Sequence, residues 1–317
     1  MKKYASIDYL YGGLLLLALF LGGCVKKFDV ALPADQKQLV LNAHFTNDTV
    51  ELAPGIYNIQ NVQLSQTASS LATTIASIDT NNIKVWLYEN GVRIGEGQPY
   101  FSQDGSPVSP YFFTNFRPKA GYRYRLVVKA RYFDTLTVEQ VMPSDMPVFT
   151  AVFKEKVGST QGGFGGGTQS LDGIQISFAD AANQSDYYEI EGSEVRTDSF
   201  GTVNNPLYLS SDLPAITRVN GKLLLADPTF DGTTTQFLVL LDAQYEGGPQ
   251  GGGTTVVRHL KIMHITQARY LYLRSLSRQQ ESGGGANPFV EPSFVYSNTS
   301  SNFGVFSMGN SREIVVQ

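Results

Sequence analysis

The segment from Tyr122 to Arg131, YRYRLVVKAR, alternates between two kinds of side chain along its whole length. One row is apolar and runs through Tyr124, Leu126 and Val128, whereas the other row is mostly basic. Because successive side chains of a strand point to opposite faces, this pattern predicts a strand with one buried and one solvated face. The chain also contains 31 glycines, 17 tyrosines and 19 phenylalanines, and only 16% of its residues are charged. These features favour a mainly β protein whose strands are separated by glycine-rich turns.

Further strand signals divide the chain into two β-rich halves. The pair Asn90-Gly91 separates two apolar runs, which is typical of a hairpin with a type I′ turn. The segment Leu136–Val141 resembles the closing strand of a first unit, and the proline-rich segment after it marks a boundary. We therefore expect an N-terminal β-sandwich at residues 38–145, either immunoglobulin-like or transthyretin-like, and a second β-rich domain at residues 146–317.

The second half contains the one convincing helix signal. Thr266 can cap a helix at about residues 267–280, in which Tyr270, Leu273 and Leu276 recur at helical spacing. Before this helix, the apolar runs 237–241 and 256–262 predict a hairpin interrupted by a glycine-rich loop. The last strand-like residues, 313–316, are expected to pair inside a sheet.

The N-terminus has the features of an export signal. Lys2 and Lys3 precede an unbroken apolar run from Leu14 to Leu21, which is too short to span a bilayer. The run ends at Leu-Gly-Gly-Cys, and Cys24 is the only cysteine among 317 residues. This arrangement resembles the lipobox of bacterial lipoprotein signals, which predicts a signal peptide at residues 1–23, a lipidated Cys24 and a tether at residues 24–37. Acyl chains would then anchor the protein in a membrane.

Two surfaces are candidate binding sites. The first is a basic strip on the strand with the alternating pattern, formed by Arg123, Arg125, Lys129 and Arg131. It would suit an anionic glycolipid or an acidic partner, and the alternative is an ordinary solvated sheet face. The second is an aromatic loop formed by Tyr111, Phe112, Phe113 and Phe116. Exposed aromatic residues are favoured anchors at recognition surfaces, and the alternative is that they fold back onto a core.

Recognisable catalytic, metal and cofactor motifs are missing from the sequence. His44, His259 and His264 are too few and too widely spaced for a zinc signature. No P-loop or G-x-S-x-G elbow occurs, and the glycine runs do not lie in a strand-to-helix turn. The net charge of −4 gives no support for nucleic-acid binding. We therefore expect no cofactor, no metal and no enzymatic activity, although a spatially assembled carboxylate pair leaves no sequence signal.

The order of several short segments along nearly the whole chain resembles a known family, the Bacteroidota lipoproteins labelled domain of unknown function 4249. In the first half these segments are Cys24, Leu39–Phe45, Val85–Gly91, Pro118–Leu126 and Val141–Pro143. In the second half they are Phe178–Asp180, Tyr187–Tyr188, Tyr270–Leu273, Asn287–Pro292, Val295–Asn298 and Gly304–Phe306. The resemblance implies an outer-membrane lipoprotein, often encoded beside a TonB-dependent receptor, with no agreed catalytic residues. A departure from the pattern is the segment from Gln66 to Asn82, which resembles a loop insertion.

Together these features predict a lipid-anchored binding or accessory protein of the outer membrane, working with a TonB-dependent transporter in nutrient capture. Two alternatives remain open: a surface adhesin or structural lipoprotein, and a glycan hydrolase. The residues after Cys24, Val-Lys-Lys-Phe-Asp, lack the run of acidic residues found in many surface-displayed lipoproteins. The periplasmic and the external leaflet are therefore both open.

Overall fold

The computed structural model describes most of the chain after residue 36. The described residues are 37–48, 51–53, 56–67, 78, 82–101, 107–161, 168–180, 182, 184–199, 201–226, 232–241, 255–281 and 294–316. The expected signal peptide, Cys24 and most of the tether lie outside them. Within these residues no helix has the length and apolar character required to cross a membrane.

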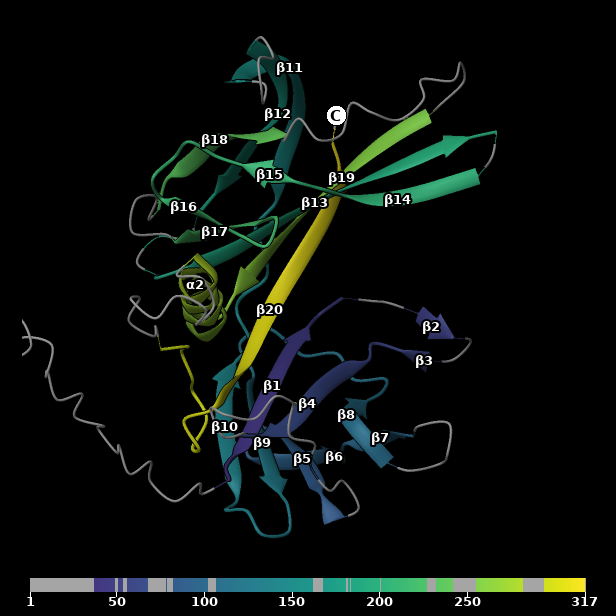
Figure 1. Cartoon of the computed structure of the whole chain (residues 1–317), viewed down its shortest axis with the longest axis vertical. Coiled ribbons are helices and arrows are strands. Elements are labelled where there is room, and N and C mark those ends of the chain that lie inside the picture. The colour runs from purple at the N-terminus through teal and green to yellow at the C-terminus, as the bar shows by residue number, and fades with distance from the viewer. Residues whose placement is uncertain are drawn as a thin grey trace, which may run out of the picture. The chain divides into compact units, whose positions relative to one another are not determined.

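The described residues form twenty strands and one helix, so the predicted mainly β fold is confirmed (Figure 1). The strands of the first half are β1 (Leu39–Thr46), β2 (Glu51–Ala53), β3 (Ile56–Tyr57), β4 (Gln60–Gln66), β5 (Lys84–Glu89), β6 (Val92–Glu96), β7 (Gln98–Phe101), β8 (Pro107–Phe113), β9 (Arg123–Lys129) and β10 (Leu136–Val141). The second half contains β11 (Phe149–Gln161), β12 (Thr168–Ala179), β13 (Tyr187–Asp198), β14 (Gly201–Leu207), β15 (Leu209–Ser210), β16 (Ile216–Val219), β17 (Lys222–Ala226), β18 (Thr234–Leu241), β19 (Thr255–Ile265), α2 (Gln267–Glu281) and β20 (Gly304–Val315).

A ten-stranded sheet extends through both halves, and a smaller sheet packs against it in each. The large sheet has the order β16-β17-β13-β19-β20-β1-β4-β8-β7, and β14 pairs with β13 beside this path. The two four-stranded sheets have the orders β10-β9-β5-β6 and β11-β12-β18-β15, and β2 pairs with β3. This arrangement gives each half a sandwich-like architecture.

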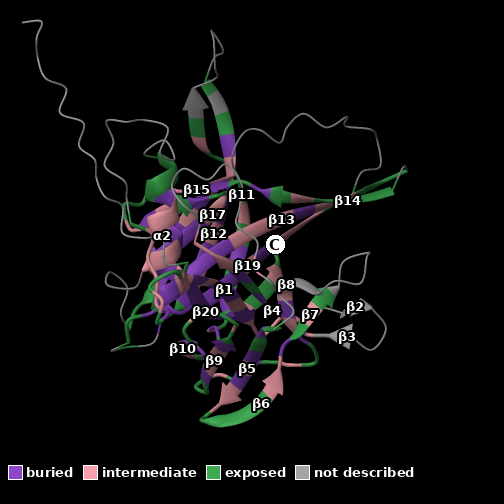
Figure 2. Ribbon diagram, turned by 60° about the horizontal axis from the view of Figure 1, so that its bottom comes forward, coloured by how far each residue is buried: buried purple, intermediate pink, exposed green. Residues whose placement is uncertain are grey.

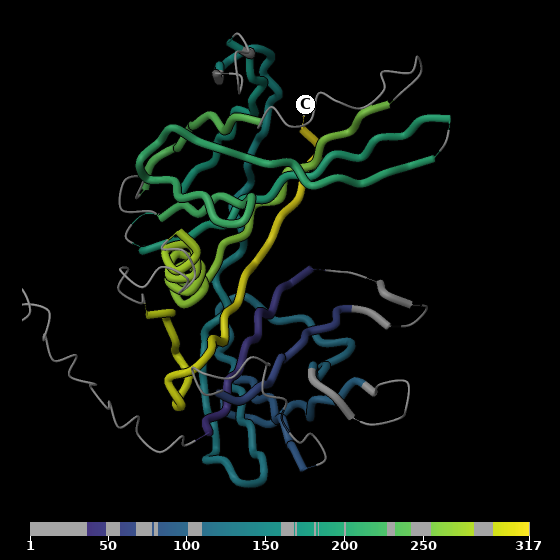
Figure 3. Tube along the Cα trace, viewed as in Figure 1, coloured from purple at the N-terminus to yellow at the C-terminus, as the bar shows by residue number. Residues whose placement is uncertain are grey.

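The strand β20 connects the two halves of the large sheet. Its first residues, from Gly304 to Gly309, pair in parallel with β1, and the residues from Gly309 to Val315 pair antiparallel with β19. Figure 3 shows this strand in yellow beside the purple β1. The segment expected to end the second domain therefore also completes the sheet of the first half. The boundary expected near residue 145 separates two hydrophobic cores, but the large sheet crosses it.

Each core lies between the large sheet and one small sheet (Figure 2). The first core includes Leu41, Phe45, Tyr124 and Leu126 and extends to Phe306 at the far end of the chain. The second core is formed by apolar residues of the second half, including Ile174, Ile190, Leu223, Leu225 and Ile262. A third cluster lies beneath α2, where Leu224 and Met263 contact Tyr270 and Leu273. Because α2 covers that side, three consecutive leucines of β17 are all buried.

The predicted turn and helix are confirmed, whereas a predicted pairing between two strands is wrong. The Asn90-Gly91 hairpin is confirmed, since both residues have positive φ and join β5 to β6. The helix at Gln267–Glu281 agrees with the predicted residues 267–280. The hairpin expected between β18 and β19 is wrong, because β18 pairs with β12 and β15 whereas β19 pairs with β13 and β20. Two strands with similar patterns can join different sheets, since their pattern specifies a buried face and not a partner.

Candidate functional site

The predicted basic strip lies on the outer face of the first small sheet. Arg123 forms an ion pair with Glu139 of β10, with 3.2 Å between Nη1 and Oε1. Arg125 stacks on the ring of Tyr88 at 4.7 Å, and Lys129 lies 5.3 Å from the ring centre of Trp86. Arg131 is beyond the end of β9 and stacks on Tyr132. Three of the four cations thus share the outer face of β9 and the fourth follows the strand, but each has an acidic or aromatic neighbour.

The predicted aromatic loop is instead part of the strand β8 and of the segment after it. Tyr111 and Phe113 are core residues, with exposed fractions of 1% and 5%. Phe116 packs against Phe45 and Tyr124 in edge-to-face geometry. Only Phe112 points to the other face of the sheet, where its ring contacts Tyr100. The expectation of an aromatic loop is therefore wrong, because the alternation of a strand directs two of these rings inward.

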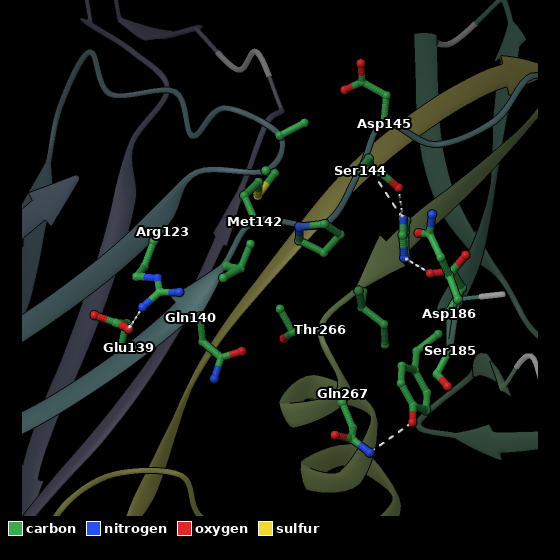
Figure 4. A pocket seen from close by; sticks show the side chains of 18 residues that line it. Arg123, Glu139, Gln140, Met142, Ser144, Asp145, Ser185, Asp186, Thr266 and Gln267 are labelled. Atoms are coloured by element: carbon green, nitrogen blue, oxygen red, sulfur yellow. Dashed lines mark hydrogen bonds and ion pairs between the residues drawn. The ribbon is translucent and has the colours of Figure 1, made fainter. Parts of the chain in front are cut away.

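An open groove of about 1080 Å³ lies where the two halves meet (Figure 4). The first half contributes residues of β9, β10 and the linker after β10, including Arg123, Glu139 and Ser144. The second half contributes the segment before β13, the end of β19 and the start of α2. Tyr187 of this second group accepts a hydrogen bond from the side-chain amide of Gln267, at 3.0 Å. The groove therefore has a lining of both polar and apolar groups, drawn from four separate parts of the chain.

Both ends of the linker are buried, which holds Ser144 in a defined place. Met142 is buried in the first core and Met146 in the second core. The backbone of Met142 also exchanges hydrogen bonds with Gly121 and Tyr122, each at 2.9 Å. Asp145 accepts a hydrogen bond at 2.8 Å from the side chain of Asn310. Ser144 itself is exposed, so its hydroxyl lies on the groove surface.

Ser144 belongs to a hydrogen-bonded row of three side chains. Its Oγ is 3.2 Å from Nδ1 of His264, the next-to-last residue of β19. On the other side of the imidazole, Nε2 is 3.0 Å from Oδ1 of Asp186. The side chains of His264 and Asp186 are only 7% and 8% exposed, and the ring of Tyr188 packs on the imidazole. Figure 4 shows the row extending from the linker to the segment before β13.

A smaller cavity of about 240 Å³ lies on the outer face of β1, beside α2. Its lining includes Asn42, His44, Gln63 and Arg269. Burial, reinforced by the positive charge of Arg269, lowers the pKa of His44 to about 3, so this imidazole is neutral. Its Nδ1 lies 3.0 Å from Ser307 and its Nε2 lies 3.3 Å from the sulfur of Met263. These contacts describe a half-buried structural histidine.

Beside this cavity, Glu189 is a fully buried carboxylate. Burial alone would raise its pKa, but the charge and hydrogen bonds of Arg269, together with Lys222, outweigh that effect and hold the pKa well below its usual range. Among the described residues, no cluster of three or more acidic, histidine or cysteine side chains is arranged to hold a metal ion.

Neither Ser144 nor Asp186 stands out in the sequence, and the spacing of His264 indicates no role for it. The third histidine, His259, lies on the same strand and pairs with Glu313 at 2.9 Å. The three residues of the row are separated by 42 and 78 positions in the sequence. No local motif marks such a set, because its geometry depends on a linker, a loop and a strand end that meet only in the folded chain.

Comparison with known proteins agrees with the resemblance described above. A search of curated proteins found no match. The model of one family, described as domain of unknown function (DUF4249), matches residues 25–314. That match covers both cores, the groove and nearly all of β20. The chain therefore belongs to the DUF4249 family.

Proposed function

We propose that this chain is a lipid-anchored binding protein of the outer membrane, and that it holds a ligand in the groove between its two halves. The observation that carries the proposal is the groove itself, which has a volume of about 1080 Å³ and polar side chains contributed by both halves. Ligand sites occur preferentially in concave regions where domains meet and where a few polar groups converge. Because the linker is anchored in both cores, its residues are fixed in position before a ligand binds.

The location rests on the N-terminal sequence and on the resemblance. The short apolar run and the Leu-Gly-Gly-Cys motif support lipidation of Cys24. The resemblance implies the outer membrane and a TonB-dependent transporter as partner. In this proposal the anchored protein presents a nutrient to that transporter, and the groove is the part that contacts the nutrient.

The anchor is tested by Cys24→Ser. The variant should leave the membrane fraction and lose acylation while the thermal unfolding of the folded region stays unchanged. A Cys24→Ser protein that still fractionates as an acylated membrane species would contradict the proposal. Affinity isolation from gently solubilised membranes tests the partner, and repeated recovery without any transporter would count against that part of the proposal.

The groove is tested separately by filling it. Gln184 is an exposed residue of its lining, and Gln236 is an exposed residue of β18 that does not line it. Gln184→Trp should remove any small molecule that native mass spectrometry detects on the protein isolated from its own membrane, whereas Gln236→Trp should retain it. An isolated wild-type protein that carries no small molecule, or equal loading of both variants, would refute the groove as the ligand site.

A further inference from the structure

The three side chains Ser144, His264 and Asp186 have the connectivity of a nucleophile, a general base and a residue that positions the base. The nucleophile is exposed on a groove, the base is within hydrogen-bond distance of it, and a buried carboxylate holds the opposite nitrogen of the base. We propose that this row is a catalytic triad, and that it cleaves carboxylic esters bound in the groove. The inference rests on the groove as the ligand site, which the proposed function also uses.

The hydrogen bonds determine which imidazole nitrogen carries a proton. The carboxylate of Asp186 can only accept, so Nε2 of His264 must donate to it across 3.0 Å. In the neutral imidazole, Nδ1 then has a free lone pair and no proton. The neighbour at 3.2 Å that can donate to this lone pair is the Ser144 hydroxyl. The serine is therefore hydrogen-bonded to a base that can take its proton.

The backbone carbonyl of Ser144 can stabilise the protonated form of the His264 imidazole. Its carbonyl oxygen is also 3.2 Å from Nδ1. This carbonyl cannot donate to the neutral ring, but it accepts a hydrogen bond once Nδ1 becomes protonated. Asp186 and the Ser144 carbonyl would then each accept one N–H of the imidazolium ion. The same site thus satisfies His264 before and after it takes a proton.

The start of α2 lies in the same groove, because His264 precedes Gln267 by only three residues. Thr266 comes just before the helix, and its carbonyl accepts hydrogen bonds from Arg269 and Tyr270. The first turn of α2 contains no acidic residue. A helix N-terminus of this kind favours the negative charge that develops on an ester carbonyl oxygen.

The reaction follows from these groups. The Ser144 oxygen bonds to the ester carbonyl carbon while its proton passes to Nδ1 of His264. The tetrahedral intermediate then collapses, the carbon–oxygen bond to the alcohol breaks, and the alcohol leaves with the proton from His264. Water, activated by the same imidazole, hydrolyses the acyl-serine to a carboxylic acid and restores the hydroxyl. No oxidant, metal or cofactor is required.

A fluorophosphonate probe tests the triad directly, because an activated serine displaces fluoride from phosphorus and retains the phosphonyl group. We expect peptide mass spectrometry of the treated wild-type protein to find this group on Ser144. Ser144→Ala should lose the label completely. Ser170→Ala is the matched control, since Ser170 is an exposed serine of β12 that does not line the groove, and it should react as the wild type does. Hydrolysis of p-nitrophenyl acetate should follow the same order.

Asp186 is proposed as a positioning residue, so its test must separate positioning from folding. Asp186→Asn should slow labelling of Ser144 by about 100-fold or more, and Asp186→Glu should recover part of the rate. The labelling rates of the two variants are compared with that of the wild type only if all three proteins have the same thermal unfolding midpoint, so that a loss of folding does not account for slow labelling. An unlabelled Ser144 in folded wild-type protein, or an Asp186→Asn variant that reacts at the wild-type rate, would overturn the triad. Neither result would affect anchoring or the binding of an unreactive ligand, so failure of the triad is distinct from failure of the proposed function.

Discussion

The ion cluster of Glu189, Arg269 and Lys222 should make a large contribution to the stability of this fold. Glu189 lies on β13 and is fully buried, and Arg269 projects from the first turn of α2. The Arg269 Nε and Nη2 atoms donate to the carboxylate at 3.0 and 3.3 Å, and the Lys222 Nζ donates at 2.8 Å. The carboxylate therefore accepts three charge-assisted hydrogen bonds, and the two from Arg269 connect the helix to the large sheet.

Glu189→Gln keeps the size of this side chain but removes its charge. Lys222 retains Glu191 as a partner at 2.5 Å, whereas Glu189 is the one acidic partner of the mostly buried Arg269 among the residues that the structure describes. Removing one partner of a buried ion pair costs about 3–5 kcal/mol, because the remaining charge is left uncompensated. We expect Glu189→Gln to lower the free energy of unfolding in urea at pH 7 by an amount in this range.

The pH dependence of this loss gives a second measurement. Because the folded state holds the pKa of Glu189 below its ordinary value of 4.5, the carboxylate contributes its stability above that pH and loses it as the pH falls below it. The difference between the wild type and Glu189→Gln should be constant from pH 8 to about 6 and should shrink below about 4.5.

Two comparison variants test whether the buried ion cluster stabilises the fold. Glu139→Gln breaks the exposed pair with Arg123 and should change the stability by less than about 0.5 kcal/mol. The double variant Glu189→Leu with Arg269→Met removes both charges and should be more stable than Glu189→Gln alone. If Glu189→Gln and Glu139→Gln have the same free energy of unfolding at pH 7, the cluster does not stabilise the fold as argued.

Two further predictions concern backbone geometry and acid sensitivity. Gly304→Ala should lower the thermal unfolding midpoint far more than Gly91→Ala: both residues have positive φ, but a Cβ at Gly304 would overlap the backbone of Leu41, whereas a Cβ at Gly91 meets no atom within 4 Å. Equal shifts in the two variants would refute the tight contact between β1 and β20. His44→Gln should reduce the loss of stability between pH 6.5 and about 3, because the wild-type imidazole is neutral when folded and takes up a proton on unfolding across that range. Unfolding free energies at several pH values would check this, and parallel curves for the two proteins would contradict it.

Much of the local structure could be predicted from the sequence. The alternation at residues 122–131 identified β9, the positive φ required at Asn90 and Gly91 identified a hairpin, and Thr266 marked the start of α2. These features depend on the period of side chains and on the conformations that particular residues favour, so neighbouring residues are sufficient to specify them. The prediction of an export signal that ends at the lone Cys24 likewise depends only on neighbouring residues.

Only the tertiary structure decided which strands pair and which side chains meet. The chain brings Gly304 against Leu41 and places β18 and β19 in different sheets, and no local pattern distinguishes these pairings from others. The same packing buries Tyr111 and Phe113 and brings Ser144, Asp186 and His264 into one row. A period of two specifies that a residue faces inward, but the partner across the core depends on how all the sheets close together. The strands of this protein are therefore set by local sequence, and its candidate site is set by contacts between distant segments.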